Sequence, residues 1–201
     1  MIVLLLVSAY LVGAIPTSWI VARLVRGIDL REHGSGNLGA TNAYRVLGWK
    51  PALPIFAGDI LKGWFPTAFF HIWDGRPSPD WALAFAAAAI VGHVWSVWVG
   101  FRGGKGVATS AGALLALAPV AAGIGFAVWA AIVFSTGYVS LGSIVAAVLV
   151  PILVAVLDGP GPVLWLTMAL AAFVTLAHRS NIRRLIAGTE NRFGSRAGEA
   201  R

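Results

Sequence analysis

The sequence predicts an all-α, polytopic membrane protein, organised as one integral membrane domain over residues 1–201. Hydrophobic residues make up 58% of the chain and charged residues only 11%, whereas a soluble domain carries about 25% charged residues. The apolar residues form long runs, and a helix needs about 20 of them to cross the hydrocarbon core of a bilayer. The net charge is +7. Because the charges lie mostly in short segments between the runs, we expect a lipid bilayer as partner and no nucleic acid.

The apolar runs give the expected membrane spans. They cover residues 1–22, 51–73, 81–101, 107–134, 138–157 and 161–178. The run 107–134 is long for one span and short for two, and Pro119, Gly123 and Gly125 lie near its middle, where a helix can break. If this run is two short helices hinged near Pro119, the chain has seven spans; if it is one helix, the chain has six.

The distribution of basic residues favours seven spans. Of the 15 arginines and lysines, five lie in 23–50, two in 101–106 and six in 179–201. Positive residues concentrate on the cytoplasmic side of a membrane, and only seven spans place all three segments there. We therefore expect the N-terminus outside and the C-terminus inside. In the first run the arginines follow the apolar residues, which is the opposite polarity to a secretory signal peptide.

The first cytoplasmic segment, residues 31–48, has the composition of an anion-binding loop. Three glycines within six residues permit positive φ angles and a close approach to a ligand, and successive N–H groups in such turns bind anions. The candidate phosphate-binding residues are Ser35, Gly36, Asn37, Thr41, Asn42 and Arg45. The alternative is a flexible linker with a solvated arginine.

The second segment, residues 100–109, is expected to open a helix. A phosphate could then bind at the helix N-terminus, with Lys105 as a point charge. The segment is not a Walker A loop, because glycine follows Lys105 where Ser or Thr is needed. The candidate binding residues are Arg102, Gly103, Gly104, Lys105 and Gly106. The alternative is a glycine turn that anchors the chain at the positive-inside face.

The third segment, residues 178–192, contains His178, Asn181 and Glu190 among several arginines. Considered alone, it is typical of a basic tail that contacts anionic lipid.

Asp59, Lys62 and His93 lie inside the spans, where ionisable residues are costly and usually functional. Asp59 and Lys62 are three residues apart and can pair on one helix face. His93 lies roughly 12 Å from the cytoplasmic end of its expected helix. It is either a buried structural histidine or, as we favour, a group of the substrate site.

A site built from these three segments at the lipid boundary could accept a water-soluble phosphate ester and an acyl donor whose tail lies between helices. The sequence has no Gly-x-Ser-x-Gly elbow, no cysteine and no histidine followed by aspartate five residues later. These absences favour transfer from an activated donor to a substrate hydroxyl, without a covalent acyl-enzyme, and with much of the rate supplied by proximity. No ligand cluster suggests a metal, and we expect no cofactor.

The motifs resemble the three signature motifs of the bacterial acyl-phosphate-dependent glycerol-3-phosphate acyltransferases, the PlsY family. The resemblance extends from the first helix to about residue 192. It is carried by 34–42 with Arg45 and Gly48, by Gly92, His93 and 101–109, by Asn181, Arg184 and 188–190, and by Asp59, Lys62 and Gly63. Where the family commonly has proline a few residues after Gly92-His93, this chain has Ser96, which we expect to change only the bend of the third helix.

The resemblance implies a seven-helix bacterial inner-membrane enzyme with its active site facing the cytoplasm. It implies transfer of an acyl chain from acyl phosphate to the 1-hydroxyl of sn-glycerol 3-phosphate, which yields lysophosphatidic acid and phosphate in the first step of phospholipid synthesis. Ser35 and Arg45 match positions used in catalysis and phosphate binding, and the loop of Lys105 matches the glycerol-phosphate site. In the third motif, His178 and Asn181 match site residues, and Glu190 matches a structural residue.

Several alternatives remain open from the sequence. The candidate general bases are His178, His93 and the substrate phosphate, whose second pKa is about 6. We favour the substrate phosphate because no carboxylate–histidine pair is evident in the sequence. Ser35, Asn37 and backbone amides are the expected oxyanion donors. A phosphate-ester transporter, a structural protein that binds anionic lipid, and an acyltransferase that uses acyl-CoA or acyl-carrier protein are the rival functions.

Overall fold

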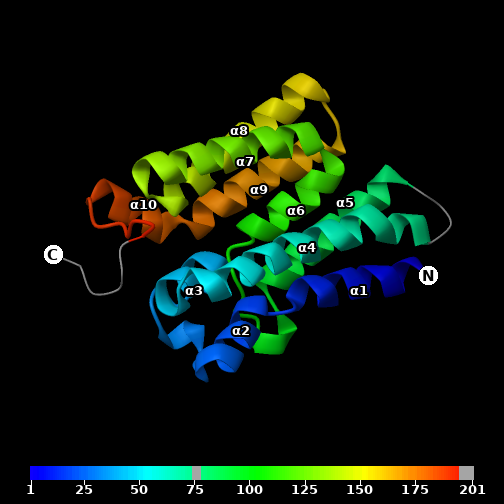
Figure 1. The fold of residues 1–201 in the computed structure, drawn as a ribbon. Coiled ribbons are helices and arrows are strands. Elements are labelled where there is room, and N and C mark those ends of the chain that lie inside the picture. The colour runs from blue at the N-terminus through cyan, green and yellow to red at the C-terminus, as the bar shows by residue number, and fades with distance from the viewer. Residues whose placement is uncertain (74–77, 195–201) are drawn as a thin grey trace. The chain divides into compact units, whose positions relative to one another are not determined.

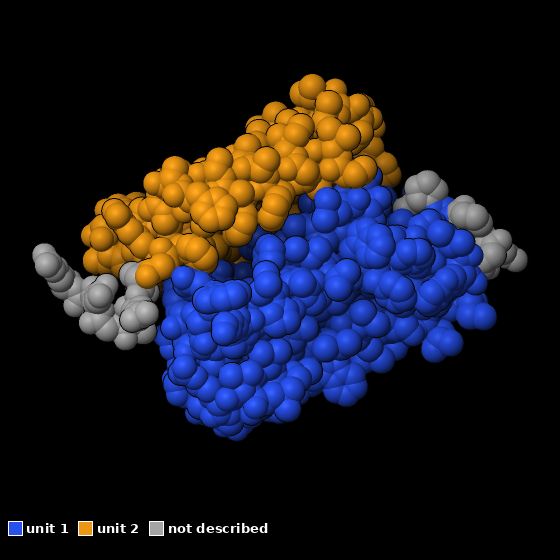
Figure 2. Space-filling model, viewed as in Figure 1, with its two compact units in different colours: residues 1–117, 196–201 blue, residues 118–195 orange. Residues whose placement is uncertain are grey.

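The structure is a computed structural model that describes residues 1–73 and 78–194 (Figure 1). Within these residues it contains ten α-helices, two short 3₁₀ helices and no strand, which confirms the all-α prediction for the described part of the chain. Arg196 and Arg201, which were counted among the basic residues of 179–201, lie outside the described residues. The chain divides into two compact units, residues 1–117 and residues 118–195 (Figure 2).

The first unit contains six α-helices. They are α1 (Ile2–Ala14), α2 (Thr17–Arg26), α3 (Ala40–Leu47), α4 (Trp49–Trp73), α5 (Pro79–Val94) and α6 (Val107–Leu117), with the 3₁₀ helices η1 (Leu30–Glu32) and η2 (Val97–Val99). The second unit contains α7 (Pro119–Thr136), α8 (Val139–Leu157), α9 (Pro162–Ala177) and α10 (Arg179–Ile186). Proline is the first residue of α5, α7 and α9, where its missing N–H costs nothing.

Two apolar runs break at proline. The break expected near Pro119 is confirmed, because α6 ends at Leu117 and α7 begins at Pro119. The first run, expected as one helix over residues 1–22, is instead two helices. The chain leaves α1 at Ala14 and starts α2 at Thr17, after Pro16, which has no N–H to continue the helical hydrogen bonds.

The described residues hold four stretches that are long and apolar enough to cross a membrane. These are Ile2–Arg26, Asp80–Val99, Pro119–Thr136 and Val139–Leu157, and α9 with α10 makes a fifth if this pair, bent by 58°, is one span. Helix α4 has 25 residues, but Asp59 and Lys62 lower its hydropathy, and α6 has only 11 residues. The seven-span count and the orientation of the termini therefore remain predictions.

Glycines bring the helices of the first unit into backbone contact. Helix α4 packs on α6, and α1 packs on α5 (Figure 1). A Cβ added to Gly112 of α6 would overlap the carbonyl group of Ile60 on α4, and a Cβ on Gly63 would overlap that of Thr109 on α6. Small residues allow this close approach, which favours helix association inside a bilayer through van der Waals contact.

Candidate functional site

The first cytoplasmic segment folds around the side chain of Asn42, which is 1% exposed. The Asn42 Oδ1 atom accepts a hydrogen bond from the Ser35 N–H at 2.8 Å. Its Nδ2 atom donates to the carbonyl oxygens of Leu30 and His33 at 3.1 and 3.0 Å. Gly34 packs against the Asn42 amide at φ 62°, where a side chain would not fit. The segment is therefore an ordered loop, and Asn42, expected to bind substrate, uses its amide to hold that loop.

The other candidates of this segment lie on the loop and on one face of α3. Ser35 and Gly36 are exposed and Asn37 is half-buried. The Gly36 N–H donates to the His33 carbonyl oxygen at 3.1 Å, so it is already used within the loop. Thr41 and Arg45 are half-buried and four residues apart on α3, so they share one helix face.

Asp29, which the sequence analysis did not single out, anchors the start of this segment. The buried carboxylate accepts hydrogen bonds from the Arg31 guanidinium, the shortest at 2.6 Å, and from the Trp19 indole at 3.2 Å. The hydrogen bonds from Arg31 hold the pKa of Asp29 below its usual range, against the opposing effect of burial. Arg31 also donates to the Val99 carbonyl oxygen at 3.0 Å, which ties the first segment to η2.

The glycine loop of the second segment folds back onto the end of α5. The Gly103 N–H donates to the Val94 carbonyl oxygen at 3.0 Å, and the Gly104 N–H donates to that of His93 at 3.1 Å. These two amides are therefore satisfied within the protein. A Cβ added to Gly104 would lie 2.7 Å from the Leu38 carbonyl oxygen, so the structure brings the second predicted segment against the first.

The second segment opens a helix, as predicted. Helix α6 begins at Val107, and the first N–H groups of a helix have no acceptor within it, which suits an anion. Lys105 is half-buried just before this turn, and Arg102 is exposed. In the same turn, within the described residues, the buried Thr109 and Ser110 hydroxyl oxygens have no hydrogen-bond partner.

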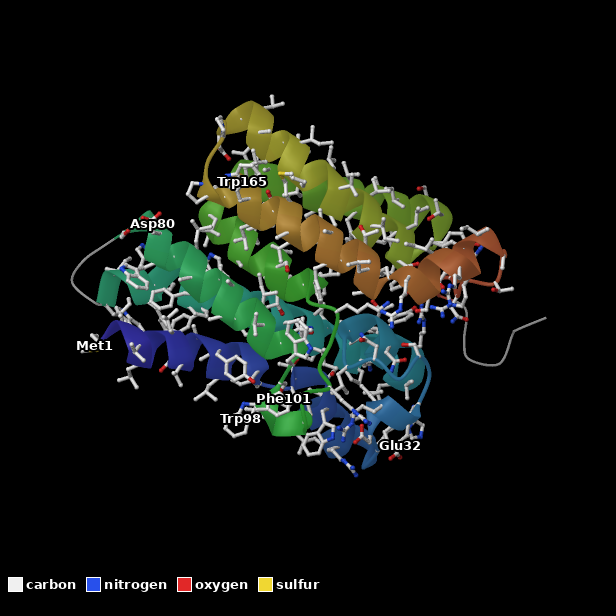
Figure 3. The ribbon with its side chains drawn as sticks, turned by 180° about the vertical axis from the view of Figure 1, so that it is seen from behind. Met1, Glu32, Asp80, Trp98, Phe101 and Trp165 are labelled. Atoms are coloured by element: carbon white, nitrogen blue, oxygen red, sulfur yellow. The ribbon has the colours of Figure 1, made fainter. Side chains whose placement is uncertain are left out.

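A chain reversal precedes the glycine loop. Helix α5 ends at Val94, so the run expected as a helix over 81–101 continues as a turn and η2. The Ser96 hydroxyl donates to the Ala14 carbonyl oxygen at 2.5 Å, at the end of α1. Trp98 and Phe101 project from this reversal (Figure 3), and both are exposed. Ser96 therefore joins two helix ends, a role the sequence comparison with the family did not indicate.

Asp59, Lys62 and His93 form one buried cluster. The predicted pairing of Asp59 with Lys62 is confirmed, with Lys62 Nζ 2.9 Å from Asp59 Oδ1. The Thr17 hydroxyl donates to the same oxygen at 2.6 Å. The His93 Nδ1 atom lies 3.7 Å from it, and the residue is 6% exposed.

The third segment belongs to the second unit, where the buried carboxylate of Glu190 organises it. Asn181 Nδ2 and the Ser140 hydroxyl donate to Glu190 Oε1 at 2.6 and 2.9 Å. Arg184 Nε donates to Oε2 at 2.7 Å. Gly188, at φ 69°, lets the chain reverse after α10 so that Glu190 returns to this helix. Burial raises the pKa of Glu190, but the hydrogen bonds from Asn181, Arg184 and Ser140 outweigh it and leave that pKa below its ordinary value.

His178 stands at the bend between α9 and α10 and is 4% exposed. Its Nδ1 atom is 2.8 Å from the Val174 carbonyl oxygen. A carbonyl oxygen only accepts, so in the neutral ring Nδ1 carries the proton and Nε2 is a hydrogen-bond acceptor. Asn181, three residues later on α10, follows on the same helix face.

Replacing Glu190 by glutamine is expected to destabilise the second unit by about 2–3 kcal/mol, because an amide group would face the Arg184 donor. The lowered pKa means that ionised Glu190 stabilises the fold above its ordinary pKa of 4.5, and that this contribution is lost as the pH falls through the folded pKa. The unfolding midpoints of Glu190→Gln and of the unsubstituted protein, followed in detergent by tryptophan fluorescence, should therefore differ at pH 7. They should converge as the pH falls below 4.5.

Glu32→Gln is the matched control for this substitution, because Glu32 is an exposed carboxylate (Figure 3). Its midpoint should follow that of the unsubstituted protein at every pH. A Glu190→Gln midpoint that equals the unsubstituted one at pH 7 would show that the carboxylate charge does not stabilise the third segment.

Comparison with known proteins gives consistent matches over nearly the whole chain. A family model described as glycerol-3-phosphate acyltransferase matches residues 3–188. A Moorella thermoacetica protein named glycerol-3-phosphate acyltransferase 2 is 47% identical over 194 residues, covering 96% of this chain and 98% of that protein. The glycerol-3-phosphate acyltransferase of Geobacter sulfurreducens is 44% identical over 185 residues, covering 92% and 94%.

Two crystal structures share the fold. Both are of PlsY (YgiH), described as an integral membrane glycerol 3-phosphate acyltransferase. Its glycerol 3-phosphate form matches with a TM-score of 0.88 at 39% identity, over 96% of each chain. Its lysophosphatidic acid form matches with a TM-score of 0.85 at 38% identity, over 96% of this chain and 95% of that one.

Proposed function

The chain belongs to the glycerol-3-phosphate acyltransferase family, and from this premise we propose that it transfers an acyl chain from acyl phosphate to the 1-hydroxyl of sn-glycerol 3-phosphate. The products are lysophosphatidic acid and inorganic phosphate, in the first acylation step of phospholipid synthesis. The enzyme acts at the cytoplasmic face of a bacterial inner membrane, which it crosses seven times. The PlsY structures, in glycerol 3-phosphate and lysophosphatidic acid forms, support this substrate and this product.

The observation that carries the proposal is the contact between the first two segments in the first unit. Gly104 packs against the Leu38 backbone, and Arg31 bonds to the Val99 carbonyl oxygen. This contact places the Ser35 loop beside the glycine loop that opens α6. Two glycine turns, a helix N-terminus and nearby basic residues form a surface suited to phosphate groups.

We assign Arg45 and Lys105 to phosphate binding. The planar guanidinium of Arg45 matches a phosphate with two hydrogen bonds, while Lys105 supplies a compact positive charge before the first turn of α6. Thr41 shares the helix face of Arg45. Arg102 and Gly106 complete the proposed binding surface, which Gly36, Gly103 and Gly104 shape through hydrogen bonds within their loops.

The proposed reaction is a direct displacement at the acyl carbon. The 1-hydroxyl oxygen of glycerol 3-phosphate forms a bond to the carbonyl carbon, and the bond from that carbon to the phosphate oxygen breaks. The carbonyl oxygen gains negative charge, which Ser35, Asn37 and backbone amides stabilise. The leaving group is phosphate, which needs no covalent acyl-enzyme to be expelled.

The hydroxyl proton goes to the phosphate of glycerol 3-phosphate, whose second pKa of about 6 suits a base near neutral pH. His178 is the second candidate. In the neutral ring, Nε2 carries the lone pair when Nδ1 bonds to the Val174 carbonyl oxygen.

Replacing Ser35 or Arg45 by alanine is expected to lower phosphate release from palmitoyl phosphate by about 100-fold or more, the effect of removing one transition-state donor. In the unsubstituted protein, phosphate release should depend on glycerol 3-phosphate, and lysophosphatidate should form in an amount equal to the phosphate released. The measurement is a phosphate assay on purified protein in lipid, with product analysis.

Lys50→Ala is the charge-matched control, since Lys50 is exposed at the start of α4; it should retain full activity. Turnover with acyl-CoA and none with acyl phosphate would reverse the donor assignment. A folded preparation that transfers no acyl chain from either donor would support a transporter or a lipid-binding protein instead.

A further inference from the structure

The glycine loop of the second segment packs on the end of α5, where His93 contacts it through both its backbone and its ring. The His93 carbonyl oxygen accepts the Gly104 N–H at 3.1 Å, and the next carbonyl, of Val94, accepts the Gly103 N–H at 3.0 Å. The His93 ring touches the loop too, because a Cβ added to Gly104 would overlap its Nε2 atom. The same Cβ would also lie 2.7 Å from the Leu38 carbonyl oxygen. The loop therefore packs against both the His93 ring and the backbone of the first segment.

The His93 ring is in turn held by the buried carboxylate of Asp59. The Nδ1 atom lies 3.7 Å from Asp59 Oδ1. That oxygen also accepts from the Thr17 hydroxyl at 2.6 Å and lies 2.9 Å from Lys62 Nζ. Asp59, Lys62 and His93 are 2%, 6% and 6% exposed. The side chains of these three residues are thus fixed in one arrangement.

The cluster also fixes the break between α1 and α2. Lys62 Nζ donates to the Ile15 carbonyl oxygen at 2.8 Å, just after α1 ends. A cation is favourable at the C-terminal end of a helix, where carbonyl groups lack intrahelical partners. Thr17 is the first residue of α2. One buried cluster therefore links α1, α2, α4 and α5 to the glycine loop.

We propose that Asp59, Lys62 and His93 form a positioning device that sets the glycine loop against the first segment, and that His93 is a positioning residue rather than the general base. The proposal rests on the proposed function and takes the glycine loop as the glycerol 3-phosphate site, as the resemblance to the family implies for the loop of Lys105. Both ring nitrogens face protein groups, Nδ1 towards Asp59 and Nε2 towards Gly104. A general base instead needs a nitrogen within hydrogen-bond reach of the substrate hydroxyl.

The test is a split between KM and kcat in His93 variants. His93→Ala removes the ring that supports Gly104, and it should raise KM for glycerol 3-phosphate about 10-fold or more while kcat falls less than about 3-fold. His93→Gln fills part of the space and should restore part of this loss. The pH profile of kcat/KM should keep its shape in both. A general base would instead lose about 10²–10⁴-fold in kcat and the acid limb of the profile.

Gly104→Ala supplies a second test that does not depend on His93→Ala alone. Its Cβ would overlap the ring, so the single variant should also raise KM for glycerol 3-phosphate. In the double variant with His93→Ala the Cβ no longer meets the ring but still meets the Leu38 carbonyl oxygen. The part of the Gly104→Ala loss that comes from the ring should therefore disappear, and the two losses should be less than additive. Additive losses would overturn the proposal.

His71→Gln is the matched control on α4. The His71 Nδ1 atom is 3.1 Å from the Thr67 carbonyl oxygen, one helical turn away, and neither KM nor kcat should change. Unfolding midpoints of all variants show whether each is folded; if His93→Ala is not, His93→Gln and Gly104→Ala decide the question.

Calorimetric binding of glycerol 3-phosphate without a donor separates this inference from the proposed reaction. If the unsubstituted protein binds glycerol 3-phosphate but does not use acyl phosphate, the donor assignment fails, and the variants still test positioning through their Kd. Variants that bind as tightly as the unsubstituted protein would overturn the positioning role. Failure of the unsubstituted protein to bind at all would overturn both.

Discussion

Replacing Gly112 by leucine is expected to disrupt the first unit, at a cost of about 3 kcal/mol or more in the free energy of unfolding. A side chain at this position would overlap the carbonyl group of Ile60. The obstacle is the backbone of α4, which cannot move aside as the end of a flexible side chain can. Accommodation therefore requires α4 and α6 to separate. Size-exclusion chromatography in detergent and the unfolding midpoint measure the effect.

Gly123→Leu is the matched control for this prediction. Gly123 is an exposed glycine inside α7, and a Cβ there has no neighbour within 4 Å. Leucine is a better helix former than glycine by about 0.8 kcal/mol, so this variant should be as stable as the unsubstituted protein or slightly more so. Equal stability of the two leucine variants would show that the close contact of α4 with α6 is not needed for folding.

Replacing Asn42 by aspartate is expected to lower kcat/KM by at least about 100-fold, although the two side chains have nearly the same shape. The carbonyl oxygens of Leu30 and His33 now accept from Asn42 Nδ2. A carboxylate would present a second acceptor to them, and each lost buried hydrogen bond costs about 1–3 kcal/mol. Acyl transfer from palmitoyl phosphate measures the result.

The structural reason for this loss is that Asn42 shapes the loop that carries Ser35. The lost hydrogen bonds should also lower the unfolding midpoint, but the protein should stay folded at the assay temperature, so the loss of activity reflects the displaced loop. Asn191→Asp, at an exposed position of the second unit, is the control and should be fully active. Full activity of Asn42→Asp would instead mean that the loop does not need this side chain.

The sequence was sufficient for the features that depend on composition and local order. Long apolar runs require helices in a bilayer, because backbone groups there must be satisfied within the segment. Pro119 broke its run as expected, since proline cannot continue a helix. Asp59 and Lys62 paired because residues three apart share a helix face. The order and spacing of the three motifs were also sufficient to indicate the family.

The tertiary structure decided which polar groups are used within the protein. Asn42, Gly103 and Gly104 were all predicted to bind substrate, yet their amide groups donate to backbone carbonyls. His93 was considered as a base, and it supports the glycine loop. None of these partners could be identified from spacing, because each depends on which distant segments meet.

Asp29, which the sequence analysis did not single out, and Ser96, whose contact it did not identify, show the same limit. Besides its neighbour Arg31, Asp29 bonds to Trp19, 10 residues away, and Ser96 bonds to Ala14, 82 residues away. A hydrogen-bonding side chain has no preferred partner in the unfolded chain. Helix propensity and apolar runs act locally and are readable from sequence, whereas these polar contacts exist only after packing has placed donor beside acceptor.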